Sequence, residues 1–472
     1  MPAATYFDLP SSSVGRPGTF RGAHQLVSLV VLCATLGGCA DYRPQPLADH
    51  PALAPSVAAL DRARPGNLPP VPADRPLTLA EVGLLAVQNS PDLRATRAQL
   101  GVAQAQVIEA GLLPDPVLSG NYNFLLGGPG TSNAIAATLT ADVTALITLS
   151  VRRLAAQEAA LQVDANVVWQ EWQTISRAQT LTIDLVEQRR LLRSLEQTLD
   201  VLRHRAELSS RAVAQGNATL QMLAPDVAAL ISLQTQYDAT ILAQEQRWQA
   251  LDMLLGLEPD VRPLLATALR APVISPGEAA AMLASLPQRR PDLIALQLGY
   301  EAQQANLRAA VLAQFPALTL GPNYSNDTTR VQSLGPSISV ALPLFNRNQG
   351  RVAIQRATRE QLREEYVARL ATAAAGAKAL LANLALLERQ LAAARTGLSQ
   401  ARSLAAGAEQ ALRGGLLDEL SYVQLIVTRL DKERQIIELE QQVLDERIAL
   451  ATLLGVGLPP VRLTPPEEPS SL

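Results

Sequence analysis

Apolar residues recur at alternating steps of four and three along the second half of the chain, which predicts a long helix. The spacing of 3.5 residues is that of a coiled-coil seam, and the alanines on it let neighbouring helices approach closely. The positions run without a break through Tyr366, Leu370, Ala373, Ala377, Leu380, Leu384, Leu387, Leu391, Ala394, Leu398, Ala401, Ala405, Ala408 and Leu412.

The first half of the chain contains a shorter run of the same kind. A continuous helix from about Arg152 to Gln215 would be roughly 95 Å long. Helix breakers follow at Gly216-Asn217 and at Gly414-Gly415, and after each the pattern predicts a return helix. Two long antiparallel helical hairpins indicate the wall of a tube rather than a compact enzyme. The seam positions are Leu192, Leu195, Leu199, Leu202, Ala206, Ser209 and Val213.

Period-two alternation predicts two strands in each half. The first pair covers residues 117–124 and 135–147, with the turn at 127–130, and the second pair surrounds the loop at Asn326-Asp327. Alternation sends the polar residues to one face, which would line a pore if the strands form one; an ordinary solvated face is the alternative. These candidate lumen residues are Ser119, Asn121, Asn123, Thr138, Thr140, Asp142, Thr144 and Thr319.

The strands have about the length that a tilted strand needs to cross a bilayer. Phe124, Phe315 and Phe345 lie in or beside them, as an interfacial aromatic girdle requires. Open sheet edges are not tolerated in lipid, so four strands per chain predict a barrel shared by several chains, and three chains would supply twelve strands. A soluble sandwich is the alternative.

Short sequences recur in the same order in the two halves, which indicates a duplication. We predict a first repeat over 77–272, a second repeat over 273–457 and a C-terminal tail over 458–472. The matches are Pro91-Asp92-Leu93 with Pro291-Asp292-Leu293, Pro116 with Pro316, Asn121-Tyr122 with Asn323-Tyr324, and Leu254-Leu255-Gly256 with Leu453-Leu454-Gly455.

The N-terminus has the pattern of an export signal. Arg16 and Arg21 precede an apolar run over 26–36, which is too short to span a bilayer. The residues ending at Cys39 resemble a bacterial lipoprotein signal, so we expect a signal peptide over 1–38, a lipid on Cys39 and a Pro-rich tether over 39–76. An ordinary secretory signal is the alternative.

Composition argues against an enzyme or a nucleic-acid binder. Hydrophobic residues make up 48 % and aromatic residues 3 %, which favours closely packed helices, and the net charge of −3 provides no basic surface for nucleic acid. The three His and two Cys do not cluster into a zinc site or a nucleophile pair. We expect no catalytic residue, no metal site and no cofactor, and we read His50 and His204 as exposed side chains.

Acidic residues near the predicted helical tips are candidates for a periplasmic gate. Asp418 and Glu419 follow Gly414-Gly415, and Asp226 lies near the corresponding place in the first half. Threefold symmetry would turn each into a ring of carboxylates that attracts cations. The alternative for Asp418 and Glu419 is that they complement a helix N-terminus.

The chain resembles the outer membrane efflux protein family, the TolC-type channels. The resemblance rests on Arg290-Pro-Asp-Leu293, Phe315-Pro316 and residues 342–350, the last being similar to versions found beside heavy-metal cation exporters. It implies a mainly helical fold with a small β part, in which a homotrimer forms a 12-stranded barrel in the outer membrane above an α-helical periplasmic barrel. The implied partners are a periplasmic adaptor, an inner-membrane pump and outer-membrane lipid. In the first repeat, Pro225 departs from the pattern, as do residues 142–153.

The leading hypothesis is therefore an exit duct of a tripartite efflux pump, conducting heavy-metal cations or small toxic compounds. A duct for type I protein secretion would have the same architecture. A non-conducting lipoprotein scaffold that bridges envelope layers is a further alternative, but it has no use for amphipathic strands.

Overall fold

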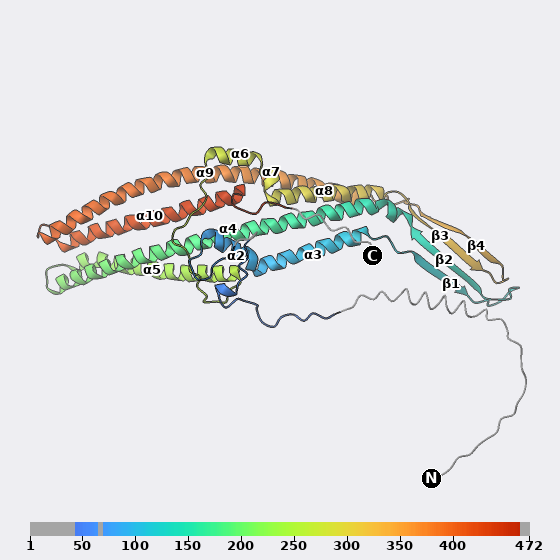
Figure 1. The fold of residues 1–472 in the computed structure, drawn as a ribbon, viewed down its shortest axis with the longest axis horizontal. Helices are drawn as coiled ribbons and strands as arrows, with labels where there is room; N and C mark the ends of the chain where they lie inside the picture. Colours follow the sequence, from blue (N-terminus) through green and yellow to red (C-terminus); the bar gives the residue numbers. More distant parts are fainter. Residues whose placement is uncertain (1–42, 65–68, 463–472) are drawn as a thin grey trace, which may run out of the picture. The chain divides into compact units, whose positions relative to one another are not determined.

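A computed structural model describes residues 43–64 and 69–462 and divides the chain into two units, Met1–Ala52 and Leu53–Leu472 (Figure 1). The predicted signal peptide, 1–38, and Cys39 lie outside the described residues. In the first unit the described residues, 43–52, are exposed and form neither helix nor strand.

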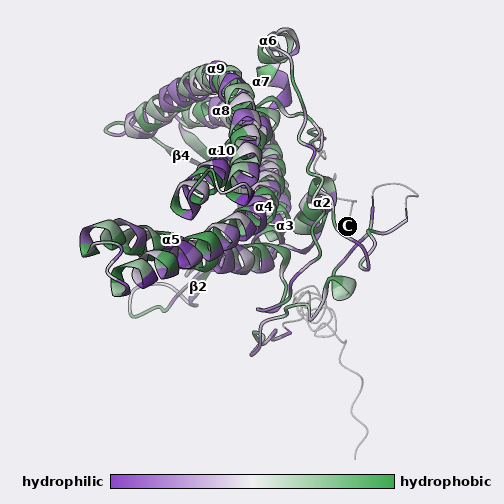
Figure 2. Cartoon of the chain, turned by 90° about the vertical axis from the view of Figure 1, so that its left-hand side faces the viewer, coloured by the Kyte–Doolittle hydropathy of each residue, from purple (hydrophilic) through white to green (hydrophobic). Residues whose placement is uncertain are grey.

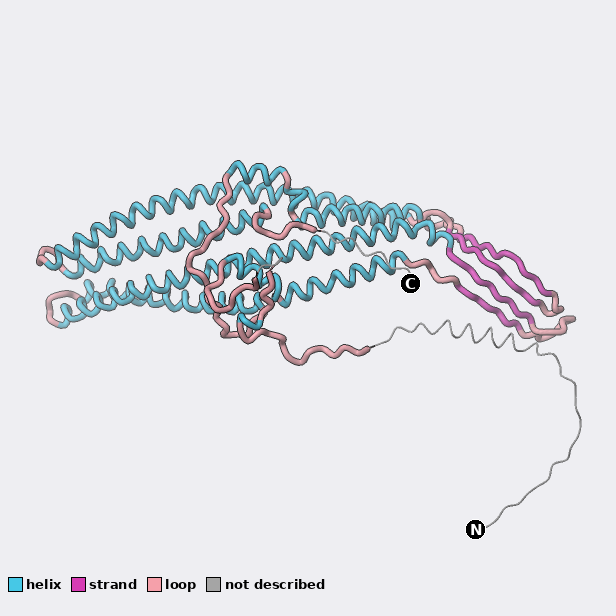
Figure 3. The backbone as a smooth tube through the Cα atoms, viewed as in Figure 1, coloured by secondary structure: helices cyan, strands magenta, loops and turns pink. Residues whose placement is uncertain are grey.

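The second unit contains the same order of elements twice: helix, two strands, very long helix, return helix (Figures 1 and 3). The remaining elements are short and lie around the middle of the long helices. The first set is α3 (Pro91–Gly111), β1 (Val117–Asn123), β2 (Ala134–Asp142), α4 (Val143–Ala214) and α5 (Leu220–Leu255), and the second is α8 (Pro291–Leu312), β3 (Ala317–Asn326), β4 (Gln332–Ala341), α9 (Gln349–Arg413) and α10 (Glu419–Leu454). The others are η1 (Val57–Ala59), α2 (Leu79–Asn89), α6 (Pro276–Ala284) and α7 (Leu286–Arg289).

The strands form one antiparallel sheet at the end of the unit opposite the helical tips. Their order is β1-β2-β3-β4, so β1 and β4 are the two edges. Within the described residues neither edge is paired with a further strand. A sheet with two open edges is a piece of a larger sheet if it lies in lipid.

The second strand is shorter than the sequence predicts. The alternating pattern extends to Ile147, but β2 ends at Asp142 and α4 begins at Val143. Asp142 caps this helix, since its Oδ1 accepts a hydrogen bond of 3.0 Å from the Ala145 amide. Residues 143–147 contain no helix breaker, and a capped helix start outweighs their strand-like alternation.

The predicted coiled-coil seam of α9 is confirmed by burial. Ala377 is fully buried, and nine of the fourteen predicted positions are buried in all. They are Ala373, Ala377, Leu384, Leu391, Ala394, Leu398, Ala401, Ala405 and Ala408. An 18-residue window of α9 is also apolar enough to cross a membrane by composition alone, which the alanine-rich seam explains.

The C-terminal part of the predicted tether packs against the helices. The amide of Ala54 donates to the Gly256 carbonyl at 2.8 Å, and Leu60 and Val71 are buried in a core formed with α2, α4 and α5. The prolines disfavour a long helix here, and apart from the single turn η1 the described residues are extended. An extended chain can still bury the apolar residues that lie between prolines.

Both return helices end at a glycine with a left-handed backbone. Gly256 has φ 67° and Gly455 has φ 71°, which closes each helix with the C-cap that glycine adopts without strain. At Gly455 an added Cβ would lie 2.5 Å from the ring of Trp172. The second Leu-Leu-Gly is thus fixed both by its backbone and by close packing.

Candidate functional site: the duct wall

The strand register separates the sheet into an apolar face and a polar face. Pairs such as Leu118 with Leu139 and Leu320 with Ile338 lie on one face, and Ser119 with Thr138 and Thr319 with Ser339 lie on the other. Because the register runs through all four strands, each face is continuous from β1 to β4. The first face is apolar except at the loop between β3 and β4, where Asn326 pairs with Gln332. A sheet with one predominantly apolar face is the pattern of barrel strands set in lipid.

Seven of the eight candidate lumen residues share the polar face. Asp142 pairs with Thr319, and Thr138 pairs with Asn323, so residues from both halves of the chain meet there. Thr144 is the exception, because it lies in the first turn of α4, where its Oγ1 accepts a hydrogen bond from the Leu318 amide at 2.8 Å.

Sequence reasoning missed much of the polar face of β3 and β4. The strand pattern there is interrupted by Gly321, Pro322, Gly335 and Pro336, which hides the alternation. The additional polar residues on the face are Asn323, Ser325, Ser333, Ser337 and Ser339.

At the helical tips, Asp226 is a buried residue and not a free carboxylate. Its Oδ1 accepts a hydrogen bond of 2.7 Å from Nε of Arg205, and its Oδ2 accepts one from the Ser209 hydroxyl. Arg205 and Ser209 belong to α4 and Asp226 to α5, so the three residues join the two helices of the first hairpin. Pro225 lies inside α5, which continues through it from Leu220.

At the tips, two side-chain contacts join the first hairpin to α10. Arg205 also donates from Nη1 to Oε1 of Gln424 at 2.9 Å, and Nε2 of His204 lies 2.9 Å from Oε1 of Glu419. His204 is half exposed, in agreement with its interpretation from the sequence. Separation of the hairpins at the tips would break both contacts.

Asp418 caps the N-terminus of α10. Its carboxylate accepts hydrogen bonds from the Ser421 amide at 2.9 Å and the Ser421 hydroxyl at 2.6 Å. These bonds stabilise the ionised form and lower the pKa of Asp418. The bond from the Ser421 hydroxyl has the larger effect, and the bond from the Ser421 amide has the next largest. The side chain is exposed and stays charged at neutral pH.

The tip residues whose contacts sequence reasoning missed are Arg205 and Ser209. Ser209 was recognised only as a seam position. The contact between Arg205 and Gln424 joins residues 219 positions apart in the chain, and the pattern of a single helix contains no sign of such a contact.

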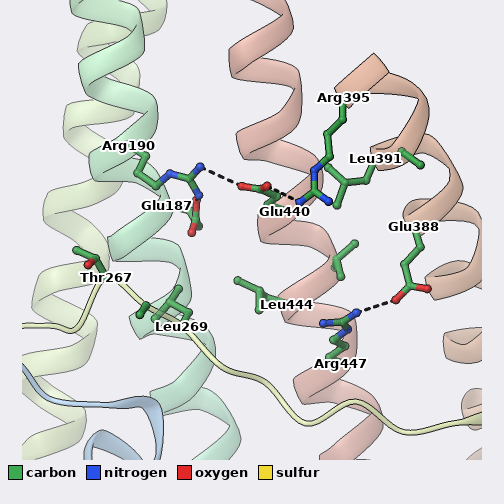
Figure 4. Close-up of a pocket in the computed structure, with 13 residues that line it drawn as sticks. Glu187, Arg190, Thr267, Leu269, Glu388, Leu391, Arg395, Glu440, Leu444 and Arg447 are labelled. Atoms are coloured by element: carbon green, nitrogen blue, oxygen red, sulfur yellow. Dashed lines mark hydrogen bonds and ion pairs between the residues drawn. The ribbon is translucent and has the colours of Figure 1, made fainter. Parts of the chain in front are cut away.

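Farther along the helices, charged residues join α4, α9 and α10 around a pocket of about 610 Å³ (Figure 4). Glu440 accepts hydrogen bonds from Arg190 at 3.0 Å and from Arg395 at 2.9 Å, and Arg447 donates to Glu388 at 2.8 Å. Each of these charges has a partner, so the pocket is a cross-linked junction between helices.

Asp445 is the most strongly perturbed carboxyl group of this region. Desolvation by burial, and then repulsion from Asp184, raise its pKa to about 7, while Arg247 opposes the shift. Its Oδ1 is buried without a hydrogen-bond partner in the described structure. Within the described ranges, no group of three or more His, Cys, Asp or Glu could hold a metal ion.

Each long helix carries both hydrophobic and hydrophilic residues. Figure 2, viewed from the tips, shows them interspersed along the same helices. Together with the two-faced sheet, this defines a class of protein, a duct whose helical wall continues into a membrane-type sheet.

Comparison with known proteins finds a family model and similar export proteins. Residues 282–456 match the model described as outer membrane efflux protein. The chain is 27 % identical over 423 residues to the pyoverdine export outer membrane protein OpmQ of Pseudomonas putida, covering 79 % of this chain and 84 % of that protein.

Solved structures show the same fold. The channel CusC matches with a TM-score of 0.65 at 19 % identity, over 87 % of this chain and 99 % of CusC. The outer-membrane channel OprN matches with a TM-score of 0.66 at 17 % identity, over 89 % of this chain and 98 % of OprN. The matched region and the shared fold make the chain similar to the outer membrane efflux proteins, the TolC-type channels, and these likenesses support an outer-membrane efflux channel that extends into the periplasm.

Proposed function

We propose that three copies of the chain close a twelve-stranded barrel by pairing β4 of one copy with β1 of the next. The observation that carries the proposal is the continuous apolar face of the sheet between two unpaired edges. Since β1 and β4 run antiparallel in the order β1-β2-β3-β4, the edges of successive copies meet as antiparallel neighbours. Closure satisfies every backbone group that lipid would otherwise leave unpaired.

In this barrel the polar face lines the lumen and the apolar face contacts lipid. Ser119, Asn121, Asn123, Thr138, Thr140, Asp142 and Thr319 then line a water-filled path, and Thr144 lies at its periplasmic end. Uncharged hydroxyls and amides dominate this lining, which suits passive conduction of varied polar cargo.

The gate lies at the helical tips. Asp418, Glu419 and Asp226 form three levels of carboxylates under threefold symmetry, but they differ in role: Asp418 and Glu419 are exposed, whereas Asp226 holds the first hairpin together. The contacts of Arg205 and His204 to α10 keep the tips closed.

The channel acts with a periplasmic adaptor and an inner-membrane pump, and Cys39 anchors it by lipid. The cargo is a class of small compounds; the relationship to a pyoverdine export protein supports this over type I protein secretion. Heavy-metal cations would be supplied by the pump, without ligands from this chain. No step of this passive transport requires catalysis or a bound cofactor.

The first test is the mass of the purified protein in mild detergent by light scattering, corrected for bound detergent. We expect a trimer that forms discrete channels in a planar bilayer. A protein that stays monomeric after reconstitution into lipid would overturn the shared barrel and favour the scaffold.

The gate is tested in the same bilayer. The double variant Asp418→Asn/Glu419→Gln should reduce preference for cations, and Asp226→Asn should increase the open fraction because Arg205 loses its partner. Gln410, on the same tip but uncharged, provides a control as Gln410→Asn. Gating and selectivity as unchanged in both gate variants as in the control would contradict the gate.

A further inference from the structure

A second groove, of about 360 Å³, lies where the helices approach the sheet. In this part of the unit α8 lies between α4 and α9, so α8 forms the floor and the other two helices form the rims. Arg152 on α4 and Arg351 on α9 line the groove from its two rims, with Asn306 of α8 on the floor and Gln355 one turn along α9 from Arg351.

Two hydrogen bonds that do not involve the arginines hold the start of α9 against α8 at the groove. Nδ2 of Asn348, the residue before α9, donates to the Ala310 carbonyl at 2.8 Å, and Nε2 of Gln303 donates to the Gln355 carbonyl at 2.9 Å. Both contacts fix the start of α9 on α8. The α9 rim is therefore anchored on the floor of the groove without help from the arginines.

The arginines of the groove have no acidic partner. Arg351 and Asn306 make no hydrogen bond or ion pair within the described residues, and Arg152 makes only a long hydrogen bond of 3.4 Å to the Ala145 carbonyl. No aspartate or glutamate lines the groove. Two unneutralised guanidinium groups and an unused amide are the donor set that a phosphate group requires.

The segments around the groove are positively charged, as the groove itself is. The stretches 143–157, 302–315 and 343–359 contain no aspartate or glutamate, and the nearest carboxylates on these helices, Glu158, Glu301 and Glu360, lie on the side of the tips. The arginines of the three stretches are Arg152, Arg153, Arg308, Arg347, Arg351, Arg356 and Arg359.

The groove lies close to the membrane end of the unit. Arg152 follows β2 by ten residues of α4, or about 15 Å of helix. Exposed apolar side chains lie between the groove and the strands, with Phe345 fully exposed and Leu344 and Phe315 about two-thirds exposed. Apolar side chains beside unpaired arginines are typical of a surface that meets the acyl chains and phosphates of one leaflet.

We propose that the groove between α4, α8 and α9 binds the phosphate of an anionic phospholipid of the inner leaflet, through Arg152 and Arg351. This rests on the proposed membrane position of the sheet. The acyl chains extend past Phe345 and Leu344 toward the strands, and Asn306 donates a further hydrogen bond to the headgroup. Phosphatidylglycerol, with one net negative charge, fits this donor set better than a zwitterionic lipid does.

The test uses full-length protein in neutral detergent and counts retained lipid by native mass spectrometry, with phosphatidylglycerol and phosphatidylcholine of identical chains as probes. We expect the wild type to prefer phosphatidylglycerol and Arg152→Gln/Arg351→Gln to lose that preference by at least about tenfold, as loss of two charge-assisted hydrogen bonds implies. Arg152→Lys/Arg351→Lys should keep part of it.

The matched control is Arg211→Gln/Arg389→Gln, which removes two exposed arginines far from the groove and should leave lipid preference unchanged. Equal retention of the two lipids by the wild type, or an unchanged preference in the groove variant, would overturn the proposal. Binding of glycerol phosphate as tightly as phosphatidylglycerol would assign the groove to a soluble anion instead.

Failure of this proposal and failure of the proposed function give different results. The groove variant should remain trimeric and conducting, since neither arginine lies on the sheet or at the tips. A wild-type monomer without channels would refute the barrel, whereas a conducting trimer indifferent to lipid charge would refute only the groove.

Discussion

Gly455 illustrates how much one residue can determine in a helix of this length. Its left-handed backbone and its contact with Trp172 both exclude a side chain. Nε1 of Trp172 also donates to the Pro459 carbonyl at 2.9 Å, so the same indole fixes the chain that follows α10.

We therefore predict that Gly455→Ala destabilises the protein by at least about 2 kcal/mol, from the left-handed conformation and the clash with the indole together. Thermal unfolding followed by circular dichroism in one detergent measures the change. Gly397→Ala is the control, because an added Cβ there meets nothing within 4 Å inside α9. Equal effects of the two substitutions would contradict the assigned role of Gly455.

Asp445 makes stability depend on pH. Its pKa is about 7 in the folded protein, above the ordinary value of 3.8, so between these values the folded state keeps a proton that the unfolded state has lost. Stability from this group is present below the ordinary value and is lost as pH rises to about 7.

Asp445→Asn should consequently stabilise the protein at pH 8 by about 1–2 kcal/mol, a figure reduced from the full shift because the side chain is partly exposed. At pH 4 the difference should shrink toward zero. Unfolding measured at both values checks this, and an equal effect at the two would show that the charge is not responsible.

At the scale of elements, the pairing of β2 with β3 is interrupted at one place. Pairing runs from Ile135 to Thr138 and resumes at Ala141, and across this interruption a Cβ on Gly321 would lie 1.6 Å from the Leu139 carbonyl oxygen. Pro322, next to it, has no amide to donate. The two strands therefore approach more closely here than any side chain on Gly321 permits.

Gly321→Ala should impair assembly of the sheet and reduce the yield of trimer in detergent. Gly335→Ala provides the comparison, since it lies on β4 with nothing within 4 Å of the added Cβ. Light scattering on both variants measures the trimer fraction. A normal yield of trimer from Gly321→Ala would show that the strands separate readily.

The elements differ in how far the sequence predicts them. The seam of α9 follows from its 3.5-residue period, because burial of a helix stripe imposes that period directly. The end of β2 does not follow from a periodic pattern, because residues 143–147 suit both a strand and a helix. Only the cap at Asp142 determines that the helix begins there. The pairing of Arg205 with Gln424 depends on how two hairpins meet, which no local pattern contains.

The packing of residues 53–64 and 69–76 does not follow from the sequence, for the same reason. Proline content predicts an extended chain, but whether that chain lies on a core depends on apolar partners in α2, α4 and α5. The available signal was the presence of large apolar residues such as Leu60 and Val71 among the prolines and charged residues.

At the scale of the whole molecule, membrane attachment has two proposed components, the barrel and the lipid on Cys39. Cys39→Ser should abolish incorporation of radiolabelled palmitate while leaving the trimer in the outer membrane, because the barrel alone holds it there. Wild-type cells provide the positive control. Labelling that persists in the variant would place the lipid elsewhere, and a wild type without label would indicate an ordinary secretory signal.

The long helices also make the molecule a ruler. α9 contains 65 residues, about 98 Å of helix, and its seam repeats every seven residues. Length can therefore change only in whole heptads, about 10.5 Å at a time, and only if α10 and the first hairpin change with it. The distance that the helices span below the outer membrane is therefore set by a whole number of heptads.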